Sequence, residues 1–355
     1  VHPNLRAGFL QRNEGPPVQV IPEEATVPWQ EVDLGELSGQ ELEDALTELS
    51  AHERLRRFRL DRPPLVRILL VELAPALHRL FLTNHHILMD GWSAPLLITE
   101  WSARYRASDP RGTEGPVPTP PSYREHLVWL SQRDHEKDLR AWREELAEIE
   151  SPTLLAGATP AGTAPALPER VDEDLSEEET TALTSMAREH GLTLNSVVQT
   201  AWALVLSRLT GRTDVVFGSI VAGRPPEITG VERMIGLFIN TVPARTVLDP
   251  RATPVATALK TQHRRTRMLE HQHVGLAEIH RACSVSRLFD SVVVFENYPH
   301  TGRDEDRSDE ELTFGVREGL DGTHYPVTLV VVPGRRLRLR LDHRTDLVDR
   351  HRALA

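Results

Sequence analysis

The chain has 355 residues, of which 39% are apolar and 26% charged, a composition typical of a globular protein. This length exceeds what one hydrophobic core usually organises, so two lobes are expected. No apolar run approaches the ~20 residues that a membrane span needs, and the first residues do not resemble a secretory signal. The net charge of −11 argues against a nucleic-acid binder, whose surface is usually basic.

Cys283 is the one cysteine of the chain, so no internal disulfide is possible. This favours a reducing, cytoplasmic setting. The residues around it, RACSVSR, resemble no nucleophile motif. The chain begins without Met in what looks like the end of a helix, and we expect the domain to extend upstream.

The first half of the chain predicts strands followed by helices. Residues 66–73 and 78–84 are predicted strands joined by the turn APAL. The second strand runs directly into the sequence HHILMDGWS, after which Ser93 is predicted to cap a helix with Pro95 in its first turn. A Pro-rich loop follows, and then one charged helix from about Tyr123 to Ile149.

The second half predicts two helices and then mainly strands. Ser176 and Glu179 form a capping box that opens a helix ending near Gly191. Thr193 is predicted to cap a second helix. Its apolar residues are spaced as a buried stripe, namely Leu194, Val197, Val198, Ala201, Leu204, Val205 and Leu209. Strands are predicted at 214–223, 237–248, 289–297, 325–332 and 336–343.

These elements predict an α/β protein of two lobes, each with a mixed sheet and packed helices. Residues 151–170 are rich in Ala, Pro, Thr and Gly, which is typical of a linker. The expected division is therefore an N-terminal lobe at 1–150, a linker at 151–170 and a C-terminal lobe at 171–355. No tandem sequence repeat is visible.

The segment most informative about chemistry is NHHILMDGWS, residues 84–93. Adjacent strand residues point to opposite faces, so His85 and His86 are expected to have different roles, one facing a cavity and one packing inward. Asp90 can fix the following loop through hydrogen bonds or an ion pair. Gly91 is expected to allow a backbone angle that a side chain would resist.

Several other chemistries lack their sequence patterns. A zinc site would need a third ligand, and HExxH is absent. The G-x-S-x-G elbow of serine hydrolases is also missing. Neither phosphate-binding glycine pattern, GxxxxGK[ST] or GxGxxG, occurs. No bound metal or nucleotide is expected.

HHILMDG, at 85–91, resembles the HHxxxDG signature of non-ribosomal peptide synthetase condensation domains, which belong to the chloramphenicol-acetyltransferase-like acyltransferases. Other segments, in the order of that family, strengthen the resemblance. Residues 235–245, IGLFINTVPAR, are similar to its IGxFVNT element. Further similar segments are VHPNLRAGF (RHxxLR, with Val1 replacing Arg), YREHLVW, LFDSVVVFENYP and LRLDHRTDLVD. HQHVGLAEI looks like a degraded HQDxPFE, with departures at His273, Gly275, Leu276 and Ala277.

The resemblance implies two chloramphenicol-acetyltransferase-like lobes in a V-shaped pseudo-dimer, with the active motif between them. It also implies donor and acceptor peptidyl carrier proteins and an adjoining adenylation domain as partners. The substrates would arrive on the carriers' 4'-phosphopantetheine arms, and the domain itself would bind no cofactor. The acceptor amine would attack the donor thioester, forming an amide and releasing a thiol. Holding both reactants together can supply ~7–11 kcal/mol of the barrier.

The resemblance assigns roles within the motif. His86 would act as general base or as hydrogen-bond anchor, since a neutral imidazole with a pKa of about 6.5 suits either role near neutral pH. The Gly91 N–H would help bind the oxyanion, or Gly91 would serve the turn alone. His85 would pack inward, and Asp90 would pair with Arg224. The substrate tunnel is expected to include Trp92, Asn240 and Phe295, although Asn240 also fits a strand-end residue that bonds nearby backbone.

Three rival functions remain open. An epimerization domain shares HHxxxDG but inverts a carrier-bound residue, although the IGLFINTVPAR element and the Trp-Ser after Asp-Gly look more like condensation. A stand-alone acyltransferase would use a diffusible thioester. A catalytically silent docking domain usually has a damaged motif, whereas His86, Asp90 and Gly91 are intact here. A heterocyclizing relative would carry an aspartate-based motif instead of the histidine pair.

Overall fold

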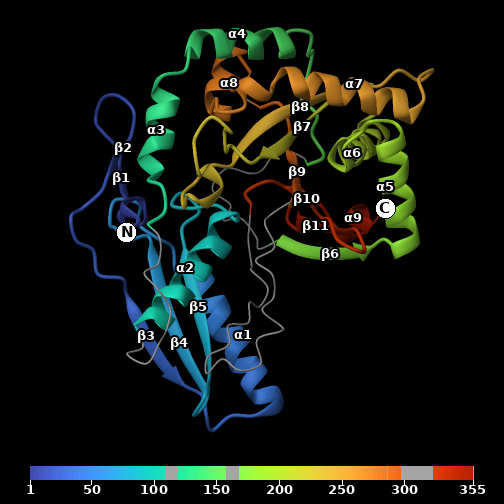
Figure 1. Cartoon of the computed structure of the whole chain (residues 1–355). Coiled ribbons are helices and arrows are strands. Elements are labelled where there is room, and N and C mark those ends of the chain that lie inside the picture. Colours follow the sequence, from blue (N-terminus) through green and yellow to red (C-terminus); the bar gives the residue numbers. More distant parts are fainter. Residues whose placement is uncertain (109–118, 157–167, 286, 297–322, 355) are drawn as a thin grey trace. The chain divides into compact units, whose positions relative to one another are not determined.

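The computed structural model describes residues 1–108, 119–156, 168–285, 287–296 and 323–354 (Figure 1). By its contacts the described chain divides into two compact units. The first contains residues 1–131 together with 224–238, and the second contains the remaining described residues. This division differs from the expected boundary at residue 150, because the chain enters the second unit at Gln132 and residues 224–238 return to the first.

The first unit is built on a three-stranded mixed sheet of order β3-β4-β5. β3 runs parallel to β4, and β4 pairs antiparallel with β5, so that Val66 lies opposite Asn84. The two strands predicted from the sequence are thereby confirmed. The elements of this unit are η1 (Pro3–Arg6), β1 (Gly8–Leu10), β2 (Val18–Val20), β3 (Trp29–Asp33), α1 (Gly39–Leu55), β4 (Val66–Ala74), β5 (Leu77–Asn84), α2 (Ser93–Ala107), α3 (Tyr123–Ser131) and η2 (Val231–Arg233).

Apolar packing fixes the β5 end of this sheet. Leu46 of α1 packs with Leu69 and Val71 of β4. Leu65, immediately before β4, packs with Leu88, two residues after His86. Both of these leucines are buried, so the residues that follow β5 are tied to the sheet.

The second unit contains a six-stranded mixed sheet of order β6-β11-β10-β9-β7-β8. β9 is parallel to both β10 and β7, and the other neighbours are antiparallel. The elements are α4 (His135–Leu146), β6 (Pro168–Asp174), α5 (Glu177–Glu189), α6 (Leu194–Thr210), β7 (Asp214–Val221), β8 (Asn240–Val247), α7 (Pro254–Arg267), η3 (Leu269–His271), α8 (Leu276–Ala282), β9 (Ser291–Phe295), β10 (Val327–Val332), β11 (Arg338–Arg344) and α9 (Arg350–Leu354).

Both faces of strand β7 are buried. Successive residues of β7 belong to different cores, because neighbouring strand residues point to opposite faces. Phe217 lies in a core with Trp202 and Leu206 of α6. Val216 lies in a second core with Trp142 of α4 and Ile279 of α8. The unit is therefore a three-layer arrangement, and the prediction of an α/β fold with mixed sheets and packed helices is confirmed.

Two helix caps agree with the sequence. The Ser176 hydroxyl accepts a hydrogen bond from the Glu179 N–H, and the Glu179 carboxylate accepts from the Ser176 N–H, completing the capping box of α5. Thr193 caps α6 by accepting from the Ser196 N–H at 3.1 Å. Both signals are local, which is why the sequence reveals them.

Three sequence predictions are corrected. The single helix at 123–149 is two helices, because Asp134 accepts from the Lys137 N–H and so starts α4 anew. The predicted linker is ordered at both ends: Leu155 is buried and β6 begins at Pro168, while residues 157–167 lie outside the described part. Ser93 is the first residue of α2 and does not cap it.

The predicted buried stripe of α6 is also wrong in part. Val198 is buried as expected. Leu204 and Val205, however, are each 44% exposed. The buried residues nearer the end of the helix are Trp202, Ala203 and Leu206. Among the described helices, none combines the length and apolar character that a membrane crossing requires.

Candidate functional site

The paired histidines lie in a turn that begins immediately after β5. The strand ends at Asn84 and residues 86–88 form the turn. The His85 N–H donates to the Leu65 carbonyl at 2.9 Å, and the Leu88 N–H donates to the His85 carbonyl at 3.0 Å. The two rings therefore differ because of the turn and not because of strand alternation. His85 is partly buried, whereas His86 is exposed.

His85 supports the turn from within. Its Nδ1 accepts a hydrogen bond from the Ile87 N–H at 3.1 Å, which assigns the ring proton of the neutral form to Nε2. The edge of its ring meets Phe58, with 6.4 Å between centroids. Burial, and secondarily the charge of His86, lowers the pKa of His85. The ring is thus held in the neutral form that can accept from Ile87.

The carboxylate of Asp90 is the centre of a buried hydrogen-bond network. Oδ1 accepts from the Ser93 N–H at 2.9 Å, and Oδ2 accepts from the Phe238 N–H at 3.0 Å. The Asp90 N–H donates to the Gly236 carbonyl at 3.1 Å. Asp90 therefore joins the start of α2 to a segment almost 150 residues further along the chain.

Arg224 is the cationic partner of Asp90, as predicted. Its Nη2 lies 3.3 Å from Asp90 Oδ1, and both side chains are almost wholly buried. The other terminal nitrogen donates to the carbonyls of Val231 and Met234. The guanidinium also lies over the Phe238 ring, 4.0 Å from its centroid. Burial lowers the pKa of Arg224, and the charge of Asp90 opposes that shift.

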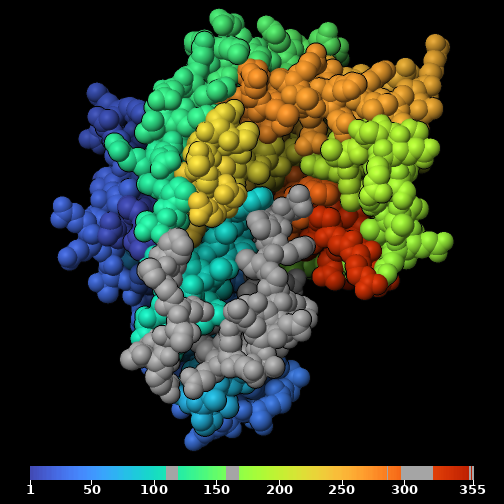
Figure 2. Space-filling model, viewed as in Figure 1, coloured from blue at the N-terminus to red at the C-terminus, as the bar shows by residue number. Residues whose placement is uncertain are grey.

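The expectation that this pair ties the motif to the other lobe is corrected. Residues 224–238 follow the predicted linker in sequence, but they belong to the first unit by their contacts. Asn4 donates to the Ile235 carbonyl at 3.0 Å, and Tyr123 donates to the Leu237 carbonyl at 2.6 Å. In Figure 2 this segment, in yellow, lies against the green atoms of α3. The pair thus stabilises the motif within one unit.

Ser93 and Gly236 form a contact that sequence reasoning missed. The Ser93 hydroxyl lies 2.7 Å from Asp90 Oδ1 and 2.8 Å from the Gly236 carbonyl oxygen, and it accepts from the Gly236 N–H at 3.1 Å. A side chain at Gly236 would overlap Tyr123, because an ideal Cβ falls 2.2 Å from a ring carbon. The close approach of Tyr123 therefore requires glycine at this position.

The ring of Tyr123 packs against Gly236 and Phe238, which both bond to Asp90. It meets Phe238 edge-on, with centroids 5.1 Å apart. Burial, together with the negative charge of Asp90, raises the pKa of Tyr123 to about 12, and the positive charge of Arg224 opposes this shift. Tyr123 therefore stays a neutral phenol that donates to the Leu237 carbonyl. The sequence signalled this residue only through the YREHLVW segment.

Gly91 and Trp92 complete the loop. Positive φ occurs at several described glycines, but Gly91 is not one of them. The expected unusual backbone angle at Gly91 is therefore not found, and a role of its N–H toward an oxyanion stays a prediction. The Trp92 indole N–H donates to the Glu232 carbonyl at 3.0 Å. Trp92 therefore makes a structural contact within the first unit.

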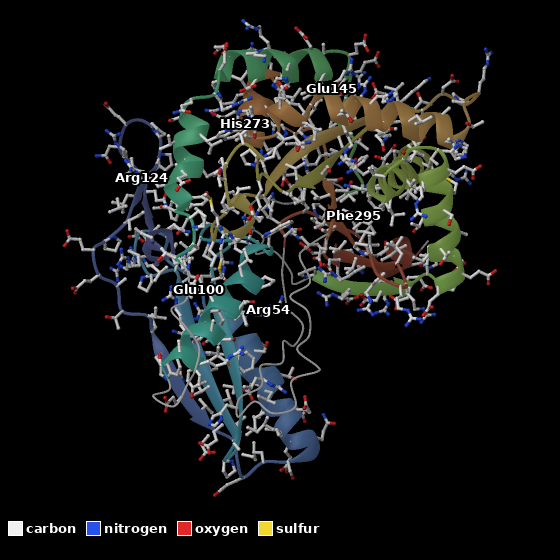
Figure 3. All side chains as sticks on the ribbon, viewed as in Figure 1. Arg54, Glu100, Arg124, Glu145, His273 and Phe295 are labelled. Carbon is white, nitrogen blue, oxygen red and sulfur yellow. The ribbon has the colours of Figure 1, made fainter. Side chains whose placement is uncertain are left out.

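Asn240 and Phe295 lie in the second unit, where each has a structural contact. The Asn240 amide donates to the carbonyls of Gln272 and Val274, at 2.8 and 2.7 Å, which is the backbone-satisfying alternative considered for it. Phe295 ends β9 and packs against the core that contains Phe217 (Figure 3). Their expected part in a substrate tunnel, like that of Trp92, stays a prediction.

Residues 271–279, HQHVGLAEI, contribute to a second buried cluster of polar side chains. Asp138 of α4 accepts from both histidines of the segment, with 2.6 Å to His271 Nδ1 and 2.9 Å to His273 Nε2. The Trp142 indole donates to the His271 carbonyl at 2.9 Å. Burial lowers the pKa of His273, opposed by the charge of Asp138. The cluster attaches the loop before α8, labelled at His273 in Figure 3, to α4.

The structure thus presents the exposed imidazole of His86 on a loop that is held in place by the hydrogen bonds of His85 and Asp90. Such an imidazole can accept a proton from, or hydrogen-bond to, a reactant brought to it. In the described residues no group of three or more histidine, cysteine, aspartate or glutamate side chains is arranged to hold a metal ion.

Comparisons with known proteins identify the family of this chain. The condensation-domain family model matches residues 1–354. Chondramide synthase cmdD of Chondromyces crocatus is 37% identical over 99% of this chain and 9% of its own length. One of the linear gramicidin synthase subunits of Brevibacillus parabrevis is 36% identical over 97% of this chain and 7% of its own length. The crystal structure of the first condensation domain of the CDA synthetase gives a TM-score of 0.76 at 22% identity, covering 99% of this chain and 81% of that one.

The fold and the motif together define a domain of the chloramphenicol-acetyltransferase-like class. The chain belongs to the condensation-domain family of non-ribosomal peptide synthetases, whose reaction is amide-bond formation. It spans less than a tenth of the two synthetases named above.

Proposed function

We propose that this domain joins a donor acyl or peptidyl thioester to an acceptor aminoacyl thioester, both tethered to carrier proteins. The observation that carries this proposal is the exposure of His86 on a turn whose flanking residues are buried and bonded. Family membership supports the reaction type, and the synthetase relatives support carrier and adenylation domains as partners.

The proposed reaction needs little activation. The acceptor nitrogen attacks the donor carbonyl carbon, and the carbonyl electron pair moves to oxygen. Collapse of this intermediate breaks the carbon–sulfur bond, and the proton of the ammonium passes to the leaving thiolate. His86 either carries that proton or anchors the nitrogen that loses it. The thioester is already activated, so the step consumes no nucleotide.

The loop that carries His86 is held by hydrogen bonds of its neighbours, which supports a positioned catalytic group. His85 holds the turn through Ile87, and Asp90 holds the loop through Ser93 and Phe238. Positioning a catalytic group and its reactants can supply several kcal/mol of the barrier. The Gly91 N–H, beside Asp90, is the candidate donor to the oxyanion.

The experiment uses two loaded carrier proteins and detects the product by intact-mass spectrometry. His86→Ala should abolish most product while the far-UV spectrum and unfolding midpoint stay near wild type. His78→Ala is the matched control, because His78 is an exposed histidine on β5. Wild-type turnover in His86→Ala would contradict the catalytic assignment.

The same assay separates the alternatives. An epimerization domain would exchange the α-hydrogen of a single carrier-bound residue with deuterium from solvent, without any acceptor. A stand-alone acyltransferase would accept a diffusible thioester as readily as a carrier-bound one. A docking domain would give neither product. Amide formation that requires both carriers supports condensation.

A further inference from the structure

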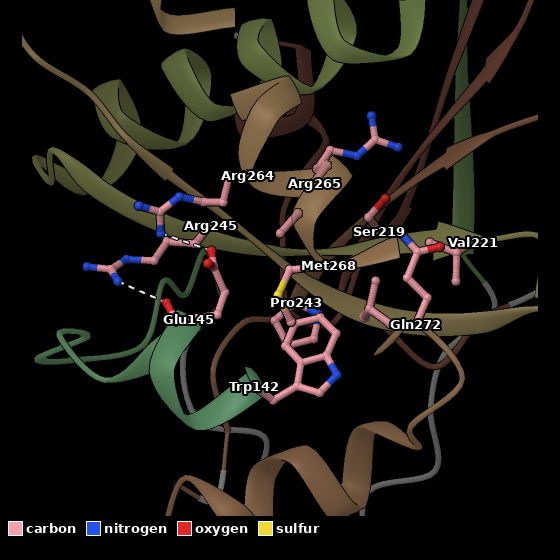
Figure 4. A pocket seen from close by; sticks show the side chains of 12 residues that line it. Trp142, Glu145, Ser219, Val221, Pro243, Arg245, Arg264, Arg265, Met268 and Gln272 are labelled. Carbon is pink, nitrogen blue, oxygen red and sulfur yellow. Dashed lines mark hydrogen bonds and ion pairs between the residues drawn. The ribbon is translucent and has the colours of Figure 1, made fainter. Parts of the chain in front are cut away.

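The second unit contains a small pocket between α4, α7 and the strands β7 and β8 (Figure 4). The volume open to the centres of water molecules is about 20 Å³. The pocket therefore holds one or two water-sized groups. Its polar lining consists of Glu145, Ser219, Arg245, Arg264, Arg265 and Gln272. Three of these six side chains are arginines, in a protein whose net charge is −11.

Two of the arginines have carboxylate partners. Arg264 Nη1 lies 2.9 Å from Glu145 Oε1. Arg245 lies 2.7 Å from Asp214 and also donates to the Glu145 carbonyl oxygen at 3.0 Å. Figure 4 marks the contacts of both arginines with Glu145 by dashed lines. These two cations are therefore already compensated by the protein.

Arg265 differs from both. Successive helix residues point about 100° apart, so Arg265 does not share the direction of Arg264 (Figure 4). Within the described residues, its side chain has one hydrogen-bond partner, the Ser196 hydroxyl at 3.4 Å, and no carboxylate at ion-pair distance. Burial lowers the pKa of Arg265, and no acidic group opposes the shift.

A partly buried cation without a carboxylate partner is unfavourable for the fold. Removing such a group from water is unfavourable unless an opposite charge or good hydrogen bonds offset the lost hydration. The 3.4 Å contact with Ser196 lies beyond the usual hydrogen-bond distance. An anion in the pocket would supply the missing partner.

Other groups of the pocket are also able to donate. The Ser219 hydroxyl accepts from the Gln199 amide at 2.8 Å, which leaves its own proton for a ligand. Gln272 lines the same pocket with a side-chain amide. Glu145, the acidic residue of the lining, is engaged by Arg264.

We propose that this pocket binds a small oxyanion, a phosphate group, with Arg265 as the principal partner and Ser219 and Gln272 as further donors. The planar guanidinium matches the oxygens of such groups. The space admits one or two oxygen atoms, so the rest of the ligand lies toward solvent. All residues of this site belong to the second unit, and the proposal does not depend on the function proposed above.

Inorganic phosphate is the first probe, measured as a shift of the thermal midpoint at constant ionic strength set with chloride. Phosphate should raise the midpoint of the wild type and leave that of Arg265→Met unchanged. Arg208→Met is the matched control, because Arg208 is an exposed arginine on the neighbouring α6, and it should respond like the wild type. Losing one charged hydrogen bond predicts about tenfold weaker binding or more.

A second measurement distinguishes binding from a structural role. Without phosphate, Arg265→Met should be at least as stable as the wild type, because it removes an uncompensated cation. A purely structural arginine would instead destabilise the protein when replaced. Ser219→Ala, which keeps Arg265, should lose part of the phosphate shift and so provides a test if Arg265→Met does not fold.

The source of the oxyanion is tested with coenzyme A and pantetheine. If coenzyme A stabilises the wild type more than phosphate and pantetheine does not stabilise it, the group belongs to a phosphate ester. If phosphate alone acts, the ligand is the free ion. Equal stabilisation of wild type and Arg265→Met, no stabilisation of the wild type, or a pantetheine effect equal to that of coenzyme A would each overturn the proposal.

Discussion

Arg224 lies 3.3 Å from Asp90 while its other terminal nitrogen holds the carbonyls of Val231 and Met234. The Arg224 guanidinium therefore contacts both the loop that contains Asp90 and the carbonyls of its own segment, residues 224–238, which lies far from that loop in sequence. The ion pair is a means of assembling this part of the chain and is not in itself strong evidence of stability, since buried pairs often gain little over apolar replacements.

Removing one member of this pair should be costly. Asp90→Ala and Arg224→Met should each lower the free energy of unfolding by ~3–5 kcal/mol, because the remaining charge is left buried without its partner. The double variant should lose less than the sum of the two. Urea unfolding measures all three.

The control for that prediction is Arg233→Met. Arg233 lies in the same segment, but it is exposed and pairs with the exposed Glu232 at 3.6 Å, so its effect should stay within about 0.5 kcal/mol. If Arg224→Met were equally harmless, the Asp90 network would not hold this segment in place.

Gly236→Ala adds a single methyl group, yet it should lower the stability of the protein strongly. Its Cβ would fall 2.2 Å from the Tyr123 ring, so the ring or the segment must move. Overpacking of this kind costs about 1–3 kcal/mol and sometimes more. Amide formation should fall too, because Gly236 bonds both Asp90 and Ser93.

Gly275→Ala is the matched control for Gly236→Ala. Its Cβ would meet only the flexible end of Glu278, at 3.4 Å, and no positive φ requires glycine there. Thermal unfolding should place this variant near the wild type. A Gly236→Ala variant as stable as Gly275→Ala would show that Tyr123 is not held as described.

The sequence predicts well those features of the fold that depend on local signals. The caps at Ser176 and Thr193 and the strands β4 and β5 depend on residues within a few positions of one another, and the structure confirms them. The break at Asp134 was missed although it is also a local cap. The charged residues on both sides of Asp134 continue the helical pattern and conceal the break.

The face of α6 was predicted wrongly for a different reason. Leu204 and Val205 are spaced as a buried stripe, but so are Val198, Trp202 and Leu206, which the structure buries. A helix that is apolar on several sides does not define its inner face by periodicity. Packing against the sheet decides it, in a core that includes residues of β7, β8, β9 and β10.

The candidate site shows the same limit. The resemblance supplied the pairing of Asp90 with Arg224, which residue spacing does not reveal. The contacts of Ser93 with Gly236 and of Asp138 with His271 join residues more than 130 positions apart. No pattern in a single sequence signals such contacts, because the two residues are brought together only by the finished fold.

Asp138 should prove far more important than its neighbour Asp134. Asp138→Ala would leave His271 and His273 without their shared buried acceptor, which predicts a loss of about 3 kcal/mol. Asp134→Ala removes an exposed helix cap and should cost about 1 kcal/mol. Equal effects, measured by urea unfolding, would show that the two histidines do not depend on Asp138.

His85 should make stability depend on pH in a defined direction. Burial lowers the pKa of His85 below its ordinary value of 6.5, so in mildly acidic solution the unfolded chain binds more protons than the folded one. The contribution of neutral His85 is therefore complete above about pH 6.5 and is lost as the pH falls toward the folded-state pKa. Protonation would also remove the Nδ1 acceptor of the Ile87 N–H.

His85→Asn tests this prediction, because the asparagine oxygen can replace Nδ1 as an acceptor but does not titrate. The free energy of unfolding of the wild type, minus that of the variant, should decrease between about pH 8 and about pH 5.5. Other histidines whose pKa is lowered, such as His273 and His280, are present in both proteins and cancel in the difference. A difference that stays constant with pH, or grows in acid, would mean that His85 is not held neutral in the turn that carries His86.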